Sequence, residues 1–166
     1  MRVFVALACP EELDEVINEY QGYVKNVPDV RILDREGLHM TVIPPWEEKE
    51  PEAVIRDFAA ITSPVIRMTF DVAAYHNEPR GPLMWLRGAA TEESKRLWLQ
   101  TWRALWSQDA PENVIPHVTL ARFIETDDLP MIPPFEDGIT VTFDRLCLYE
   151  SYGDLEYRII GEKKLS

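Results

Sequence analysis

The stretch Ile115-Pro116-His117-Val118-Thr119-Leu120-Ala121-Arg122 places a histidine and a threonine two residues apart, each followed by an apolar residue. Consecutive side chains of a β-strand point to opposite faces, so His117 and Thr119 would share one face and the apolar residues the other. The same tetrad occurs earlier as His39-Met40-Thr41-Val42. Each copy predicts a strand that presents an imidazole and a hydroxyl above an apolar base. Two such strands facing each other would form a cleft.

Further strands are predicted on both sides of the tetrads. Apolar runs indicate strands over residues 3–8, 30–33, 38–43, 65–75, 83–87, 118–123, 139–149 and 155–160. The pair Pro44-Pro45 should end the strand that carries the first tetrad. Several neighbouring strands are close enough in sequence to form hairpins.

Three helices are predicted between these strands. Apolar residues at helical spacing follow Pro10, Pro51 and Thr91, and Thr91 is a suitable N-cap. The second helix should bury Val54, Ile55, Phe58 and Ile61. Because strands and helices interleave and hairpins are frequent, the pattern favours an α+β fold over an all-parallel sheet. No change of composition marks a linker, so we expect one domain over residues 1–166.

The charge of the chain limits its partners. Seventeen Lys and Arg stand against 29 Asp and Glu, which gives a formal net charge of −12. A protein that follows a long duplex presents a broad basic surface, so we expect no extended duplex binding. An RNA end or a nucleotide, gripped by a few groups in a cleft, suits this chain better.

The cysteines and the apolar runs indicate where such a protein would work. Cys9 and Cys147 lack a Cys-x-x-Cys partner and lie in apolar strand-like runs, which is typical of buried free thiols in a reducing compartment. No apolar run approaches the length of a membrane span. We therefore expect a cytoplasmic protein with no membrane partner.

The repeated tetrad suits the hydrolysis of a phosphodiester. A single His-x-Thr would favour a core histidine bonded to a threonine, but two of the three histidines in the chain stand in this pattern. Opening a cyclic phosphodiester with water needs one group to accept a proton and another to donate one, and a pair of imidazoles can do both near neutral pH. Threonine hydroxyls could hold the phosphate oxygens. A zinc site would need a third ligand at usable spacing, so we expect no metal and no cofactor.

At these residues the chain resembles the 2H phosphoesterase superfamily, which is defined by two His-x-Thr/Ser motifs. Within it the chain is similar to the RNA 2′,3′-cyclic phosphodiesterases, historically called 2′-5′ RNA ligases. The resemblance extends over nearly the whole chain. It rests on residues 1–7, 37–42, 83–86, 115–122 and 146–151, of which the Pro-His-Val-Thr-Leu-Ala-Arg of the second motif is the most specific.

The resemblance implies a fold and a set of roles. The fold would be a bilobal α+β domain with two pseudo-symmetric antiparallel sheets and outer helices around a central cleft. His117 would be the base toward water and His39 the acid toward the leaving 3′ oxygen. Thr41, Thr119 and Arg122 would contact the phosphate. Because Arg122 stands at an odd offset from His117, a bulge or the end of the strand must turn it into the cleft.

Other aromatic and histidine residues have simpler interpretations. After the first tetrad the chain departs from the family's usual continuation and runs Ile43-Pro44-Pro45-Trp46. Trp46 would either stack on a nucleobase at the mouth of the cleft or pack against the protein. His76 is expected to be a solvated loop residue. Trp98, Trp102 and Trp106 step by four and are expected in the core.

The sequence therefore predicts a monomeric, metal-independent hydrolase of RNA processing. It would act on 2′,3′-cyclic phosphates at RNA ends or in cyclic nucleotides and give a 2′-phosphate. Two alternatives stay open: a 2′-5′ oligonucleotide phosphodiesterase or ligase of the same superfamily, and a nucleotide- or RNA-end-binding module that catalyses nothing.

Overall fold

Two antiparallel sheets form the framework of the computed structural model, which describes residues 1–125, 127–153 and 155–166. Sheet A has the order β3-β1-β8-β9 and sheet B the order β2-β6-β5-β4-β7. The strands of sheet A are β1 (Arg2–Ala8), β3 (His39–Glu47), β8 (Arg145–Ser151) and β9 (Tyr157–Lys164). Those of sheet B are β2 (Arg31–Ile32), β4 (Ile66–His76), β5 (Leu83–Gly88), β6 (His117–Arg122) and β7 (Ile139–Phe143). The predicted α+β fold with two antiparallel sheets is confirmed.

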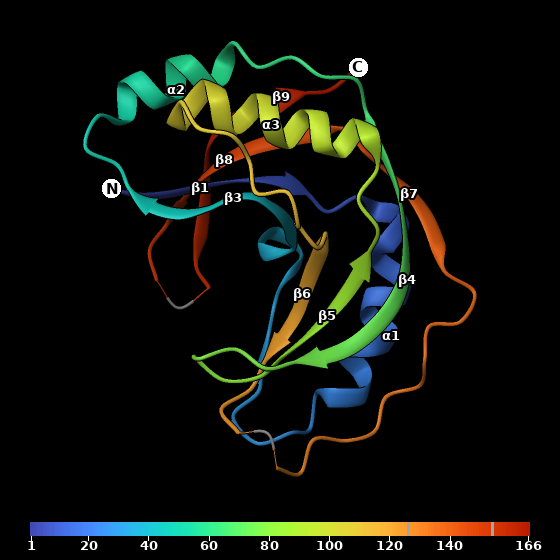
Figure 1. The fold of residues 1–166 in the computed structure, drawn as a ribbon. Coiled ribbons are helices and arrows are strands. Elements are labelled where there is room, and N and C mark those ends of the chain that lie inside the picture. The colour runs from blue at the N-terminus through green and yellow to red at the C-terminus, as the bar shows by residue number, and fades with distance from the viewer. Residues whose placement is uncertain (126, 154) are drawn as a thin grey trace.

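The helices cover the outer sides of the two sheets. A 3-10 turn (Glu11–Leu13) leads into α1 (Asp14–Val24), which contacts β6 of sheet B. Helices α2 (Pro51–Ala59) and α3 (Glu92–Trp106) pack against each other and onto β9 and β3 of sheet A (Figure 1). Helix α1 thus follows a strand of sheet A but covers sheet B, and α3 follows a strand of sheet B but contacts sheet A. These crossings tie the two halves together.

Local sequence explains where the helices begin. Thr91 caps α3 with a reciprocal pair of bonds, because its hydroxyl accepts from the Ser94 amide at 3.1 Å and the Ser94 hydroxyl accepts from its amide at 2.9 Å. Pro51 opens α2, where its missing amide hydrogen has no cost. The prediction that Ile55 of α2 faces inward is wrong: it is 37% exposed. Ile55 follows Val54 by one residue and therefore lies about 100° further around the helix, away from the face on which Val54 and Phe58 are buried.

Two strand boundaries differ from the prediction. Strand β3 continues through Pro44 and Pro45 to Glu47 and pairs with β1 there, because β3 lies at the edge of sheet A, where a proline need not donate to a neighbour. The run over residues 139–149 is two strands, β7 and β8, which separate at Asp144 and belong to different sheets. Strand order, a non-local property, decides both outcomes.

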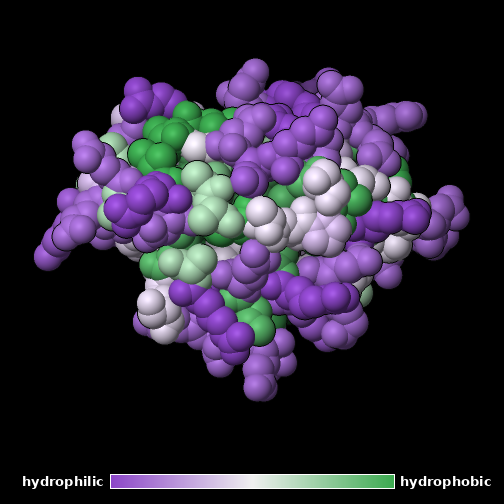
Figure 2. All heavy atoms as spheres, turned by 90° about the horizontal axis from the view of Figure 1, so that it is seen from above, coloured by the Kyte–Doolittle hydropathy of each residue, from purple (hydrophilic) through white to green (hydrophobic). Residues whose placement is uncertain are grey.

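One hydrophobic cluster runs through both sheets and contacts all three helices. Cys9 and Cys147 are buried and free, as predicted. Seen from the side of α2 and α3, the surface is mostly hydrophilic and carries only small hydrophobic areas (Figure 2). Among the described residues, no helix is long and apolar enough to span a membrane.

Candidate functional site

The two tetrads lie on strands of different sheets that contact each other. His39 and Thr41 are in β3, His117 and Thr119 are in β6, and these strands are in contact. All four side chains are half-buried, whereas the apolar residues that alternate with them are buried. The alternation predicted from the sequence is therefore present in both strands.

Each tetrad histidine is held by the same local hydrogen bond. Nδ1 of His39 lies 2.7 Å from the carbonyl oxygen of Gly37, and Nδ1 of His117 lies 2.8 Å from that of Ile115. A carbonyl oxygen can only accept, so Nδ1 carries the proton in both rings. Nε2 of each neutral ring is then left with a lone pair, which is the form that accepts a proton and becomes a donor once charged.

A bulge lies at the last residue of each tetrad. The register between β1 and β3 shifts at Val42, and the register between β5 and β6 shifts at Leu120. The second bulge makes Leu120 and Ala121 consecutive buried residues and returns Arg122 to the half-buried side. This is the change of face that Arg122 needs to reach the cleft.

The two bulges are fastened by side chains from helices. The indole Nε1 of Trp102 in α3 donates to the Val42 carbonyl at 2.8 Å, and Nε2 of Gln21 in α1 donates to the Leu120 carbonyl at 3.1 Å. The Leu33 amide also donates to the Leu120 carbonyl, at 3.1 Å. Helix–strand contacts thus satisfy carbonyl groups that a bulge removes from regular pairing.

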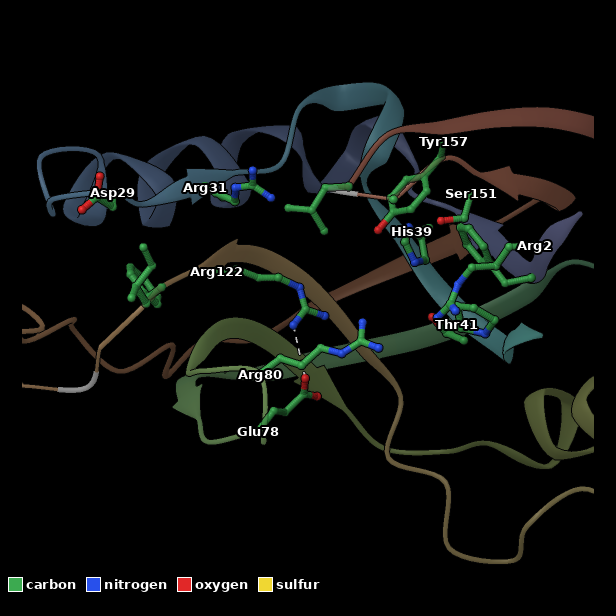
Figure 3. A pocket seen from close by; sticks show the side chains of 16 residues that line it. Arg2, Asp29, Arg31, His39, Thr41, Glu78, Arg80, Arg122, Ser151 and Tyr157 are labelled. Carbon is green, nitrogen blue, oxygen red and sulfur yellow. Dashed lines mark hydrogen bonds and ion pairs between the residues drawn. The ribbon is translucent and has the colours of Figure 1, made fainter. Parts of the chain in front are cut away.

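A cavity of about 910 Å³ opens beside the first tetrad. Of the predicted site residues it is lined by His39 and Thr41 of β3 and by Arg122 of β6 (Figure 3). Its size suits a nucleotide-sized ligand. Among the described residues that line the cavity, His117 and Thr119 do not occur. His117 is nevertheless adjacent, because the charges of Glu78 and Arg122, which do line it, act on its ring.

Charged residues outside the tetrads also line this cavity. The arginines are Arg2, Arg31, Arg80 and Arg122, and the acidic residues are Asp29 and Glu78. The carboxylate of Glu78 pairs with Arg122, at 3.2 Å from Nη1 (Figure 3). A protein with a formal net charge of −12 thus gathers cations in its cleft. This fits the expectation that an anion would be gripped locally.

His39 lies in an aromatic well. Its ring centroid is 4.9 Å from that of Phe4, 5.4 Å from that of Tyr157 and 5.8 Å from that of Tyr149. Burial among these rings lowers the pKa of His39, the bond to Gly37 opposes the shift, and the charges of His117 and Arg122 add to it, so that the pKa is about 4. His39 is therefore neutral at pH 7 in the unliganded protein.

His117 has a different environment. It packs against Trp85 with centroids 4.6 Å apart, and His76 stacks on the same indole with centroids 4.0 Å apart. Burial lowers the pKa of His117, but the bond to Ile115 and the charge of Glu78 oppose the shift. His76 is exposed, as expected, but it ends β4 and belongs to this stack rather than to a free loop.

Comparison with known proteins agrees with this architecture. The family model of the 2′-5′ RNA ligase superfamily matches residues 9–155. The chain belongs to this superfamily. No curated protein matches the chain.

Several solved structures share the fold. TT0787 of Thermus thermophilus has a TM-score of 0.74 at 21% identity, with 99% of this chain and 97% of that chain covered. E. coli LigT in its apo form has a TM-score of 0.71 at 22% identity over 99% and 97% of the two chains. E. coli LigT complexed with 3′-AMP has a TM-score of 0.72 at 21% identity over 99% and 98%. At these identities the likeness shows a common fold.

Trp46 packs against the protein and, within the described residues, does not line the cavity. Its Nε1 donates to the Glu48 carboxylate at 2.9 Å, and its ring packs edge-on against Trp106 with centroids 5.3 Å apart. The packing interpretation of Trp46 is therefore favoured and base stacking is not supported. Trp98 is buried, and Trp102 and Trp106 pack against the core, as predicted.

Sequence reasoning missed Glu78, Arg80 and the aromatic well. Glu78 and Arg80 stand in the connection between β4 and β5, where prolines and a glycine indicate only a turn. Phe4, Tyr149 and Tyr157 come from three strands that sheet order brings together. Among the described residues, no group of three or more His, Cys, Asp or Glu side chains is placed to hold a metal ion.

Proposed function

We propose that this protein is a metal-independent phosphodiesterase that opens 2′,3′-cyclic phosphates at RNA ends or in cyclic nucleotides and leaves a 2′-phosphate. The observation that carries the proposal is the matched pair of histidine bonds on contacting strands. Both Nδ1 atoms are bonded to backbone carbonyls, at 2.7 Å and 2.8 Å, so in each neutral ring Nε2 carries the lone pair that can accept a proton. The adjacent cavity is lined by cations that suit an anion.

The reaction uses both imidazoles in one displacement. One Nε2 accepts a proton from water as the water oxygen forms a bond to phosphorus. The other Nε2 donates a proton to the 3′ oxygen as its bond to phosphorus breaks. Thr41, Thr119 and Arg122 would bind the non-bridging oxygens and hold the phosphorus in line between the rings.

Two assignments of the proton roles follow from different observations. The resemblance implies His117 as base and His39 as acid. The environments in the unliganded protein favour the reverse, because burial keeps the pKa of His39 near 4, whereas Glu78 helps His117 to hold a proton. A bound phosphodiester adds a negative charge that raises both pKa values. The pH dependence of catalysis in a Glu78 variant separates the two assignments.

The test is a substrate panel for purified protein. Adenosine 2′,3′-cyclic monophosphate, an RNA oligonucleotide with a 2′,3′-cyclic end and a 2′-5′-linked oligoadenylate are offered with and without EDTA. We expect turnover of the cyclic phosphates in both conditions. His39→Ala and His117→Ala should each lower kcat by roughly 10²–10⁴-fold. Thermal unfolding checks that both variants are folded.

The outcomes separate the alternatives. If the protein hydrolysed only the 2′-5′-linked oligoadenylate, it would instead be a 2′-5′ oligonucleotide phosphodiesterase. Wild-type protein that turns over none of the three, with and without Mg²⁺ or Mn²⁺, would refute both. Binding of adenosine 2′-monophosphate without any turnover would instead indicate the non-catalytic module.

A further inference from the structure

Glu78 puts a negative charge where an incoming phosphate needs a positive one. It comes from the β4–β5 connection, outside both tetrads, and its side chain is 34% exposed in the cavity wall. Its carboxylate lies 3.2 Å from Nη1 of Arg122, whose side chain is 33% exposed. The arginine that is proposed to bind the phosphate is therefore already partnered by a carboxylate.

The same carboxylate acts on the second histidine. The charge of Glu78 favours the protonated form of His117, while the charges of His76 and Arg122 oppose it. Glu78 thus pairs with a cation that would hold the phosphate and acts electrostatically on a ring that would exchange a proton. A ligand that displaces Glu78 from its ion pair with Arg122 brings the ligand's negatively charged oxygens close to the Glu78 carboxylate. The repulsion that results depends on the ligand's charge.

Substrate and product of the proposed reaction differ in charge. A cyclic phosphodiester carries one negative charge, whereas a 2′-phosphomonoester carries close to two at pH 7 because its second pKa is about 6. The cavity arginines attract both species. A fixed carboxylate beside the phosphate repels the doubly charged product more strongly than the singly charged substrate. Its presence therefore changes selectivity as well as affinity.

We propose that Glu78 is a specificity residue that makes the cleft favour the singly charged diester over the doubly charged monoester. This inference rests on the proposed function, since it takes the diester as substrate and the monoester as product. Glu78 limits inhibition by product and by inorganic phosphate. In doing so it weakens part of the attraction that Arg122 would otherwise exert.

The test is Glu78→Gln, which keeps the size of the side chain and its ability to accept a bond from Arg122. At pH 7.5 the inhibition constants of adenosine 2′-monophosphate and of inorganic phosphate should fall about three- to tenfold, the range expected for the loss of one partly exposed charge. The KM for adenosine 2′,3′-cyclic monophosphate should fall less, by roughly two- to threefold, because the diester carries about half the charge of the monoester. At pH 5.5, where phosphate is mostly singly charged, the difference between wild type and variant should shrink.

The matched control is Glu162→Gln. Glu162 forms a comparable partly exposed pair with Arg145, at 2.8 Å, outside the cavity. It should leave the inhibition constants and KM unchanged. An equal change in both variants would mean that net charge, not position, is responsible.

Two outcomes would overturn the proposal. If Glu78→Gln weakens the binding of adenosine 2′-monophosphate or leaves it unchanged, Glu78 merely orients Arg122. The proposal fails equally if the diester and the monoester tighten by the same factor. Titration calorimetry with adenosine 2′-monophosphate and inorganic phosphate needs no turnover. Failure of the proposed function would leave this measurement possible, so the two failures remain distinguishable.

Discussion

The two halves of the cleft present the same tetrad in different surroundings. In sheet A, His39 is enclosed by Phe4, Tyr149 and Tyr157. In sheet B, His117 packs on Trp85 and feels the charge of Glu78. The backbone arrangement is nevertheless repeated in both halves: a histidine bonded to the carbonyl two residues before it, and a bulge three residues after it.

This difference separates two kinds of information in the molecule. The repeated motif and its bulge fix where each imidazole lies and which of its nitrogens carries the lone pair. Residues outside the motif, from strands and connections remote in sequence, set how readily each imidazole takes a proton. A symmetric scaffold can therefore hold an acid and a base, because only their environments need to differ.

The largest expected effect concerns stability at low pH. The pKa of His39 is about 4 in the folded protein and near 6.5 when unperturbed. Between these values the unfolded chain binds more protons than the folded one, so stability falls as the pH drops from about 6.5 to about 4. This contribution amounts to at most about 3 kcal/mol. His39→Asn should therefore lose less stability over this range than wild type, measured by urea unfolding at pH 7 and pH 4.5.

The same measurement on His117→Asn sharpens the comparison. Burial also lowers the pKa of His117, but Ile115 and Glu78 oppose the shift, so its substitution should change the pH dependence less. Carboxylates titrate in the same range and affect every protein, which is why differences between variants are compared. If the free energy of unfolding changed equally with pH in wild type and in His39→Asn, the aromatic well would not depress the pKa of His39.

Much of this comparison can be anticipated from the sequence. The period-two alternation around His39 and His117 predicts which side chains share a face, since it depends only on neighbouring residues. The odd offset of Arg122 requires a bulge or a strand end, and a bulge is present at Leu120. Helix starts are predictable for the same local reason, as the capping of α3 by Thr91 shows.

The remaining features depend on contacts between distant segments. Pro44 and Pro45 indicate a strand end, but the edge position of β3 allows the strand to continue. The sequence leaves Trp46 compatible with base stacking, whereas the fold supplies Trp106 of α3 as its partner. Glu78 carries no motif, and its role becomes visible only where its carboxylate meets Arg122.

A smaller effect is expected from the helix side chains that fasten the bulges. Trp102→Phe leaves the Val42 carbonyl without its indole donor and should cost about 1–3 kcal/mol. Gln21→Met removes the Nε2 donor from the Leu33 carbonyl, at 2.9 Å, and from the Leu120 carbonyl. It should cost about 1–2 kcal/mol, because the Leu120 carbonyl keeps the Leu33 amide. Chemical denaturation measures both. Gln21→Met should also raise the KM, since its bulge directs Arg122.

The control for this pair is Gln100→Met, an exposed position of α3. It should change neither stability nor KM. If Trp102→Phe and Gln21→Met were as stable as this control, the two hydrogen bonds would contribute nothing to holding the bulges. An unchanged KM in Gln21→Met would mean that the hydrogen bond from Gln21 to the Leu120 carbonyl is not needed to position Arg122.

The smallest expected effect is also the one that distinguishes the two histidines in catalysis. A bell-shaped pH–rate profile is expected, with one limb from each imidazole. The groups acting on His117 are Glu78, which raises its pKa, and His76 and Arg122, which lower it; Arg87 pairs with it in the neighbouring strand. Glu78→Gln removes the raising charge and should move the His117 limb of kcat/KM down by about 0.5 pH unit.

Which limb moves identifies the role of His117. If His117 is the acid, it must be protonated to act, so the alkaline limb shifts to lower pH and the active range narrows. If His117 is the base, it must be neutral, so the acidic limb shifts to lower pH and the range widens. Glu162→Gln should move neither limb. A profile that is also unchanged in Glu78→Gln would show that this carboxylate does not act on His117, and the difference between the two halves would then rest on the aromatic well alone.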